Sequence, residues 1–199
     1  GAGAAREPDV RHPRRGSPYL SPAAEPQHAP AASAYLSAGL SVLPALRRGD
    51  EKRVALPRWS LFQRRLPTPA EWESWMTAGP EAVCIVCGAI SGNLEMIDFD
   101  CAGEAYEAWR AMVEEIEPGL VDRLFVESTP SGGRHVVYRC ESPVCGNTKL
   151  AQRRVDASGD APVVIGGKTL TPRRSADGKW SVVVTLIETR GEGGMFLCA

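Results

Sequence analysis

The sequence predicts an α+β fold with a largely antiparallel sheet. Segments with helical periodicity lie mostly in the first half of the 199 residues, and β-rich runs lie mostly in the second half. Two of these runs, 123–128 and 134–140, flank the turn sequence TPSGG, which is typical of a hairpin or a tight loop. Together these observations favour helices that cover a sheet made of sequential, antiparallel strands.

Residues 30–40 predict a short helix that closes at Gly39. The next segment, 41–46, has the pattern of a strand. It is followed by RRGDEKR at 47–53, which predicts a charged turn. The folded part of the chain is therefore expected to begin near residue 30.

Residues 66–76 predict a second helix with a clear start signal. Thr68 occupies the N-cap position, Pro69 the first helical position, and Glu71 completes a capping box. This combination satisfies backbone N–H groups that would otherwise lack partners at the helix start.

The middle of the chain predicts two strands and a helix. Residues 81–88 read as a buried strand, 89–93 as a turn, and 94–100 as a strand that returns beside the first. Residues 103–119 have helical periodicity and end in a Pro-Gly stop. After a polar stretch, further strands are expected at 161–167, 179–190 and 194–199.

Residues 1–29 are rich in Ala, Pro, Arg and Gly, a composition that cannot bury a core. We therefore expect a disordered leader at 1–29 and one folded domain at 30–199. Because the chain stops at Ala199 directly after an apolar strand, we also expect it to be a fragment that is truncated at its C-terminus.

The charge balance carries no global signature of a nucleic-acid binder, since 23 Lys and Arg residues face 24 Asp and Glu residues. Local basic pairs are present, and scattered solvated charge is the usual interpretation of any one of them. No apolar run is long enough to cross a bilayer, and the N-terminus lacks a secretory signal, so a cytoplasmic protein with no membrane partner is expected.

Six cysteines raise the question of a structural zinc site. The spacing of Cys84 and Cys87 fits a zinc knuckle, but a buried strand directs these side chains to opposite faces. The spacing of Cys140 and Cys145 is too loose, and no histidine lies nearby. Free, reduced thiols are therefore the favoured interpretation.

The strand predicted at 94–100 ends in two carboxylates, Asp98 and Asp100. Side chains two residues apart on a strand leave the same face, so these like charges lie close together and repel. A divalent cation reverses that cost, because Mg²⁺ and Mn²⁺ favour carboxylate oxygen. The pair is a candidate metal site; a solvated strand end is the alternative.

His135 is the only histidine in the predicted domain, and it follows a glycine-rich turn. The turn contains Ser131, Gly132 and Gly133. Such a turn can direct backbone N–H groups at phosphate oxygens, with Ser and His side chains as additional donors. An ordinary hairpin with a half-buried structural histidine is the alternative.

Glu188, near the end of the run 179–190, offers a third carboxylate. Three acids at strand ends suit two-metal phosphoryl or nucleotidyl transfer. The alternative is an exposed ion pair between Glu188 and Arg190, which contributes little to stability.

Five blocks of the chain, in order, resemble the bifunctional DNA primase/polymerase domain of the archaeo-eukaryotic primase superfamily. The form is that of replication proteins from plasmids, phages and integrated mobile elements. The blocks are GLSVLPALRRGDEKR, CGAISGNLEMIDFD, TPSGGRHVVYR, GNTKLA and IETRGEGGMFLCA. The resemblance covers about residues 30–199 and depends on the ordered set, because the paired acids alone are not specific.

The resemblance implies an archaeo-eukaryotic primase fold, with a mixed or antiparallel RRM-like catalytic sheet flanked by helices. It implies a nucleotidyltransferase that acts as DNA primase, DNA polymerase or both, by a two-metal mechanism. Asp98, Asp100 and Glu188 match the family's catalytic metal ligands, for Mg²⁺ or Mn²⁺. Many relatives have Asp at the position of Glu188, whose longer side chain reaches further.

The resemblance also implies the nucleotide contacts. Ser131 and His135, with the intervening glycines, match the motif that binds the triphosphate of the incoming nucleotide. Relatives often carry a Gly-x-Lys-x-Pro segment near the start, for which Lys52 is the nearest candidate here. Lys149 and Arg190 are candidate triphosphate or template contacts.

The implied partners are a single-stranded DNA template, a primer, and deoxynucleotides or ribonucleotides, with a helicase domain in the full-length protein. Template is expected to bind basic side chains and stacking aromatics. One candidate patch, within RWSLFQRR, consists of Trp59, Phe62, Arg64 and Arg65. The same pattern is equally typical of a packed helix with a polar edge.

Two other functions fit part of the pattern. A metal-dependent nuclease also uses clustered acids, although it does not account for the Ser-Gly-Gly-x-His turn. A non-catalytic module that binds single-stranded or origin DNA within a larger replication initiator is the second alternative.

Overall fold

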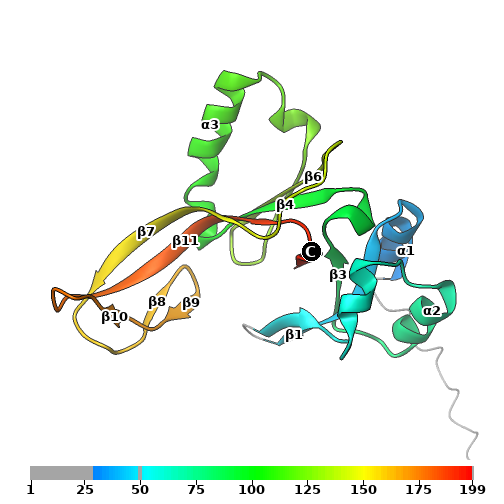
Figure 1. The fold of residues 1–199 in the computed structure, drawn as a ribbon, viewed down its shortest axis with the longest axis horizontal. Helices are drawn as coiled ribbons and strands as arrows, with labels where there is room; N and C mark the ends of the chain where they lie inside the picture. The colour runs from blue at the N-terminus through cyan, green and yellow to red at the C-terminus, as the bar shows by residue number, and fades with distance from the viewer. Residues whose placement is uncertain (1–28, 49–50, 199) are drawn as a thin grey trace, which may run out of the picture.

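The computed structural model describes residues 29–48 and 51–198. The leader predicted at 1–29 lies outside the described residues apart from residue 29. The described chain is an α+β structure in which every paired strand is antiparallel, as the sequence predicts (Figure 1).

The smaller of the two main sheets, which we call sheet A, has the strand order β12-β3-β1-β2. Its strands are β1 (Ser41–Arg48), β2 (Glu51–Val54), β3 (Ala82–Val86) and β12 (Met195–Leu197). β1 and β2 form a hairpin, so the segment 47–53 is mostly strand and not the charged turn that the sequence predicts. Its apex, residues 49–50, lies outside the described residues.

The larger sheet, sheet B, has the order β10-β11-β4-β6-β5, and β7 also pairs with β11. Its strands are β4 (Leu94–Phe99), β5 (Phe125–Ser128), β6 (Arg134–Arg139), β7 (Lys149–Ala157), β10 (Arg173–Arg174) and β11 (Trp180–Arg190). A separate hairpin consists of β8 (Val163–Ile165) and β9 (Lys168–Leu170). β7 and β11 extend away from the body of the molecule as a long ribbon, with β10 toward its far end and the β8–β9 hairpin alongside it (Figure 1).

The helices cover both sheets. They are α1 (Ala29–Ser37), α2 (Pro69–Thr77) and α3 (Tyr106–Ile116), with 3₁₀ turns η1 (Trp59–Gln63), η2 (Ala89–Ser91), η3 (Cys101–Gly103) and η4 (Val121–Arg123). Among the described residues, none of the helices has the length and apolar character that crossing a bilayer requires.

β4 joins the core to the candidate site. On one face, Leu94 and Met96 are buried in the core cluster that also contains residues of α1, β1 and β3. On the other face, Phe99 packs against Tyr106 and Trp109 of α3, with ring centroids 5.2 and 5.1 Å away. The first face continues beyond Met96 to the two aspartates, because side chains alternate along a strand. The apolar half therefore anchors the acidic half.

The expectation that residues 94–100 return beside 81–88 is wrong. β3 belongs to sheet A and β4 to sheet B, and only a bridge between Gly88 and Leu94 links them. The segment between them contains three residues in the left-handed region, Gly88, Gly92 and Asn93, and the short helix η2. These conformations carry the chain out of the plane of sheet A before β4 begins.

The polar stretch before residue 161 is a strand that the sequence analysis missed. β7 has an alternating exposed and half-buried pattern and pairs with β11 over almost its whole length. Its half-buried positions are Ala151, Arg153, Val155 and Ala157, which include no large apolar side chain, so the usual apolar signal of a strand is weak.

Cys84 of β3 and Cys87, directly after this strand, lie in different core clusters. Burial raises the pKa of each thiol to about 12. Both side chains are therefore protonated packing groups that cannot share one metal ion.

The capping box at the start of α2 provides a test of the local structure. Thr68 and Glu71 exchange the expected hydrogen bonds, and Arg65 forms a bidentate ion pair with Glu71. The hydrogen bonds from Arg65 and from the Thr68 backbone lower the pKa of Glu71 from 4.5 to about 2. Because the pKa falls on folding, the stabilisation is complete above pH 4.5 and disappears as the pH falls through about 2.

We expect Glu71→Gln to lower the melting temperature at pH 7, and the difference from wild type to shrink between pH 4.5 and pH 2. Thermal melts followed by circular dichroism at a series of pH values measure it. Glu73→Gln is the control, since Glu73 is exposed on the same helix and forms no ion pair within the described part of the chain. A Glu71→Gln difference that is constant with pH contradicts the ion-pair account.

Candidate functional site

Strand register brings three of the predicted site residues to one place in sheet B. Asp98, on the central strand β4, is directly opposite His135 of β6 on one side and Glu188 of β11 on the other. Directly opposite side chains in antiparallel strands share a face and lie about 5 Å apart at Cβ. Asp100 directly follows β4 in extended backbone, two residues after Asp98, so its side chain leaves the same face.

The three carboxylates form a compact cluster. One oxygen from each of Asp98, Asp100 and Glu188 lies within 4.8 Å of the other two. Burial raises the pKa of the Asp98 carboxyl, and the charges of Asp100 and Glu188 raise it further, against the opposing effect of His135 and Lys168. Three partly buried acids this close need positive charge nearby to remain ionised.

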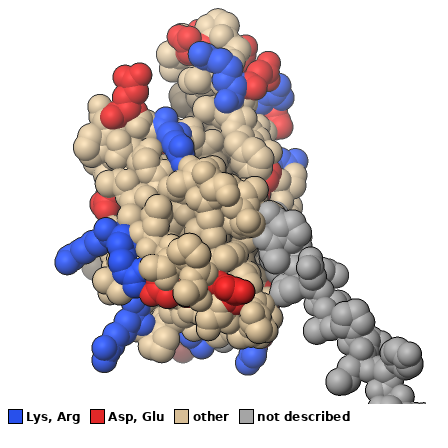
Figure 2. All heavy atoms as spheres, turned by 90° about the vertical axis from the view of Figure 1, so that its right-hand side faces the viewer, with Lys and Arg blue, Asp and Glu red and all other residues tan. Residues whose placement is uncertain are grey.

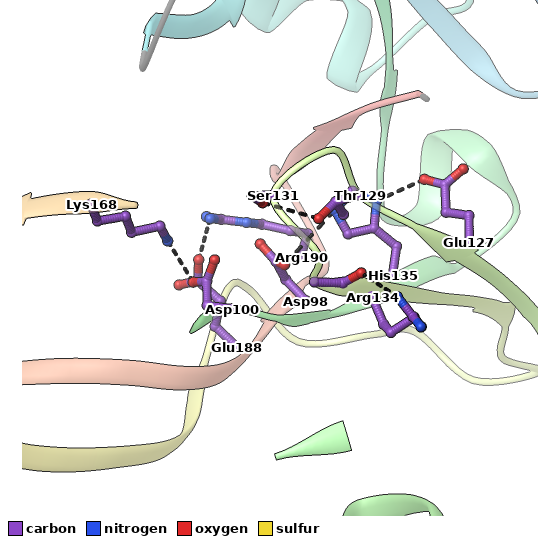
Figure 3. Close-up of polar contacts among 11 residues, drawn as sticks. Asp98, Asp100, Glu127, Thr129, Ser131, Arg134, His135, Lys168, Glu188 and Arg190 are labelled. Atoms are coloured by element: carbon purple, nitrogen blue, oxygen red, sulfur yellow. Dashed lines mark hydrogen bonds and ion pairs between the residues drawn. The ribbon is translucent and has the colours of Figure 1, made fainter. Parts of the chain in front are cut away.

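Lys168, Arg190 and the imidazole of His135 each lie against one of the acids (Figure 3). Lys168 Nζ lies 2.6 Å from Asp100 Oδ2, and Arg190 forms an ion pair with Glu188. His135 Nε2 lies 3.8 Å from Asp98 Oδ1. Asp100 Oδ2 is buried and accepts no hydrogen bond of good geometry from the described residues, so its contact with Lys168 is electrostatic.

The carboxylate of Glu127, outside the three-acid cluster, orients the imidazole of His135. Its Nδ1 lies 2.7 Å from Glu127 Oε1, on the neighbouring strand β5, where the two residues are directly paired (Figure 3). An ionised carboxylate only accepts hydrogen bonds, so Nδ1 carries the proton and donates it. Nε2 is thereby directed toward Asp98 and the other acids.

The turn before β6 is held by its own hydrogen bonds. Thr129 N donates to Gly133 O, Gly132 N donates to Thr129 O, and the hydroxyls of Thr129 and Ser131 lie 3.1 Å apart. Gly132 is in the left-handed region, and a Cβ at Gly133 would lie 2.4 Å from Phe99 O. Glycine is therefore required where this turn passes the end of β4.

Two cavities meet at Asp98. The first, of about 490 Å³, is lined by Asp98, Asp100, Ser131 and Lys168, and we call it the carboxylate cavity. The second, of about 350 Å³, includes Trp59 in its lining, and we call it the Trp59 cavity. Four residues line both: Lys52, Asp98, His135 and Arg190.

The donor set fits a hard divalent cation. Three carboxylates supply only oxygen ligands, as Mg²⁺ and Mn²⁺ prefer, and the buried Asp100 Oδ2 accepts no hydrogen bond of good geometry within the described part of the chain. Among the described residues, this is the one acidic, histidine or cysteine group compact enough to hold a metal ion.

The chain matches the family model of the bifunctional DNA primase/polymerase, N-terminal domain, over residues 32–199. It belongs to this family. The resemblance seen in the sequence is thereby confirmed, and membership implies DNA primase or polymerase activity with DNA and nucleotides as substrates. No curated protein matches the chain.

The other predicted nucleotide and template contacts of this primase/polymerase domain do not all line the two cavities. Lys52 and Arg190 line both cavities, whereas Lys149, opposite Glu188 on β7, lines a separate groove beside them. Within the candidate template patch, Trp59 lines a cavity, but Phe62 is buried edge-on against the ring of Trp75.

Of the two arginines in the candidate template patch, one packs within the domain and the other is exposed. Arg65 stacks over Phe62 and pairs with Glu71, and the Arg64 side chain is exposed. For Phe62 and Arg65, packing within the domain is thus the better interpretation of this patch.

Sequence reasoning missed Lys168 and Glu127. Lys168 arrives from the β8–β9 hairpin, about 70 residues after the aspartates, and no local pattern links it to them. Glu127 carries a weak signal, since it lies on the strand predicted to pair with that of His135.

The tight passage at Gly133 predicts the effect of adding one methyl group. We expect Gly133→Ala to destabilise this primase/polymerase domain by about 1–3 kcal/mol, because the new Cβ overlaps Phe99 O and Thr129 Oγ1. Urea unfolding measures this. Gly159→Ala is the control, since its Cβ would have no neighbour within 4 Å, and equal stability losses in both variants contradict the packing account.

Proposed function

We propose that the domain catalyses template-directed nucleotidyl transfer at Asp98, Asp100 and Glu188, in the replication of a phage, plasmid or mobile element. The observation that carries the proposal is the convergence of these three acids within 4.8 Å in a chain of the primase/polymerase family. In the proposed reaction, a primer 3′-hydroxyl attacks the α-phosphorus of the incoming nucleotide. The α–β phosphoanhydride bond breaks, pyrophosphate leaves, and the hydroxyl proton passes to solvent.

We propose a two-metal site in which these carboxylates hold Mg²⁺ or Mn²⁺. Bound there, divalent cations neutralise triphosphate charge and lower the pKa of a coordinated hydroxyl. The protein contributes a rigid platform, because Asp98 and Glu188 lie on paired strands of sheet B and Asp100 directly follows one of these strands.

Residues facing the acids across the carboxylate cavity are proposed to bind the triphosphate. Ser131 contributes a hydroxyl and His135 an Nε2 position oriented by Glu127. Lys52 and Arg190 contribute positive charge to both cavities. These groups position the β- and γ-phosphates for in-line attack, so His135 acts as a phosphate ligand and not as a general base.

The domain that we propose to perform this reaction spans residues 30–199, with sheet B as an RRM-like catalytic platform. Single-stranded template, primer and nucleotide are its proposed partners, and a helicase domain is the proposed neighbour in the full-length protein.

The acids provide the direct test. We expect Asp98→Asn, Asp100→Asn or Glu188→Gln to reduce primer extension by about 10³-fold, because each removes a charge from the metal site while keeping the side-chain shape. Extension of a labelled primer on a single-stranded template with Mg²⁺ or Mn²⁺, resolved on a gel, measures the rate.

Asp122→Asn is the matched control, since Asp122 is exposed and far from the cluster in sequence. Wild-type extension by the Asp98 variant would remove the metal-ligand role. Degradation of DNA that requires metal but no nucleotide would indicate a nuclease. DNA binding without incorporation in the wild type would indicate a non-catalytic module.

The ammonium of Lys168 lies against Asp100, where it would compete with a divalent metal ion for the carboxylate. Removal of this ammonium tests the competition. We expect Lys168→Met to strengthen Mn²⁺ binding by a few-fold, because the ammonium no longer has to leave Asp100 Oδ2. Titration calorimetry with Mn²⁺ alone measures the affinity without any reaction.

Lys179→Met is the matched control, because Lys179 pairs with the exposed Asp177 in a distant turn. Weaker Mn²⁺ binding by the Lys168 variant, or an equal change in both variants, would contradict the competition between ammonium and metal.

A further inference from the structure

A third cavity, of about 710 Å³, lies along the ribbon of β7 and β11, beside the segment that leads from β9 into β10. We call it the arm groove. Among the described residues, its lining includes four cationic side chains and no carboxylate. The cations are Lys149, Arg154, Arg173 and Arg174.

These four cations form no ion pair with the described part of the chain. Arg174 Nε donates a hydrogen bond to Gly178 O, which fixes the side chain and leaves its charge uncompensated. Arg153, adjacent in sequence to Arg154, is instead held by Glu104 through two contacts of 2.7 and 3.1 Å. Neutralised and uncompensated arginines thus occupy opposite faces of one strand.

The alternation of side chains along a strand places Arg153 and Arg154 on opposite faces of β7. Arg154 is directly opposite Val183 on β11, and Arg173 of β10 is directly opposite Ser181. Val183 and Ser181 are two residues apart on β11, so the two arginines share a face. The other face of the ribbon packs in the core cluster that contains Val182 and Val184.

The arm groove continues into the carboxylate cavity. Thr169 and Leu170 line both, and Lys149 is directly opposite the acid Glu188. Lys149 and Arg173 are about seven residues apart along β11, or roughly 23 Å at the usual strand rise. That length corresponds to about seven phosphates along one strand of a B-form duplex.

We propose that the arm groove binds the sugar–phosphate backbone of the primer–template DNA as it approaches the carboxylates. The inference deepens the proposed function, since it names the surface that holds the nucleic-acid substrate. No aromatic ring of the described chain lines the groove, so phosphate contacts dominate and binding tolerates any base sequence. Its lack of carboxylates distinguishes it from the proposed metal and triphosphate site.

The charge pattern elsewhere supports this choice of surface. The chain as a whole has a formal net charge of −1, so a groove with only cations is a local enrichment. At the end of the molecule that carries α1 and α2, acidic and basic side chains are interspersed among uncharged surface (Figure 2). A phosphate backbone is attracted to a continuous row of cations and not to a mixed surface.

The experiment measures DNA binding without nucleotide or divalent metal, by fluorescence anisotropy of a labelled primer–template over a series of salt concentrations. We expect Arg154→Gln and Arg173→Gln each to weaken binding and to reduce the slope of log K against log salt by about 0.9, the loss of one phosphate contact. Arg153→Gln, with the same charge change on the opposite face, keeps the wild-type slope. Arg154→Lys retains most of it, because the charge remains.

Unchanged slopes in Arg154→Gln and Arg173→Gln, or an equal loss in Arg153→Gln, overturn the proposal. Melting temperatures identify any unfolded variant, and Arg154→Lys and Arg173→Gln then carry the test independently. Asp98→Asn separates the two hypotheses. If it stops extension while the arm variants bind normally, the proposed function stands and the groove assignment fails; if it extends normally while the arm variants lose slope, the reverse holds.

Discussion

Electrostatic repulsion among three neighbouring carboxylates is the constraint on which the rest of this structure depends. Antiparallel register holds Asp98 and Glu188 directly opposite each other, with Asp100 on the same face. The surrounding cations offset that repulsion, and one of them comes from a separate hairpin. This hairpin reaches the acids only because Gly166 passes so close to Cys101 that a Cβ there would lie 2.7 Å from its Cα. Lys168 of this hairpin and Arg190 of β11 thus hold positive charge against the acids.

β4 connects stability to chemistry within one short strand. Its apolar residues anchor it on both faces, between the sheet A core and α3. The acids at its end can then remain close together, because the strand has too many buried contacts to bend away from them. Burial also raises the pKa of Asp98, which is the electrostatic consequence of holding it there. The core and the site are therefore two ends of one element, and a change that loosens the first disturbs the second.

The near-neutral composition conceals a separation of charge. Acids gather at the centre of sheet B, cations without acidic partners among the described residues line the arm groove, and mixed charge covers the α1 and α2 end. The carboxylate cavity shares lining residues with both the Trp59 cavity and the arm groove. In the proposed function, the nucleic acid and the nucleotide approach the same carboxylates through these different openings. Net charge by itself could not have indicated this, since opposite signs cancel in the sum.

The sequence by itself determined the features that depend on near neighbours. The common face of Asp98 and Asp100, the capping box of Thr68 and Glu71, and the hairpin before His135 follow from spacing along the chain, and the ordered motifs identify the family. Only the tertiary structure decided which distant side chains meet. Lys168 at Asp100, Glu127 at His135, the separation of β3 from β4, and the alternating cations of β7 all depend on strand pairing and register. Pairing is set by the packing of the whole chain, whereas local periodicity shows only which face a side chain occupies.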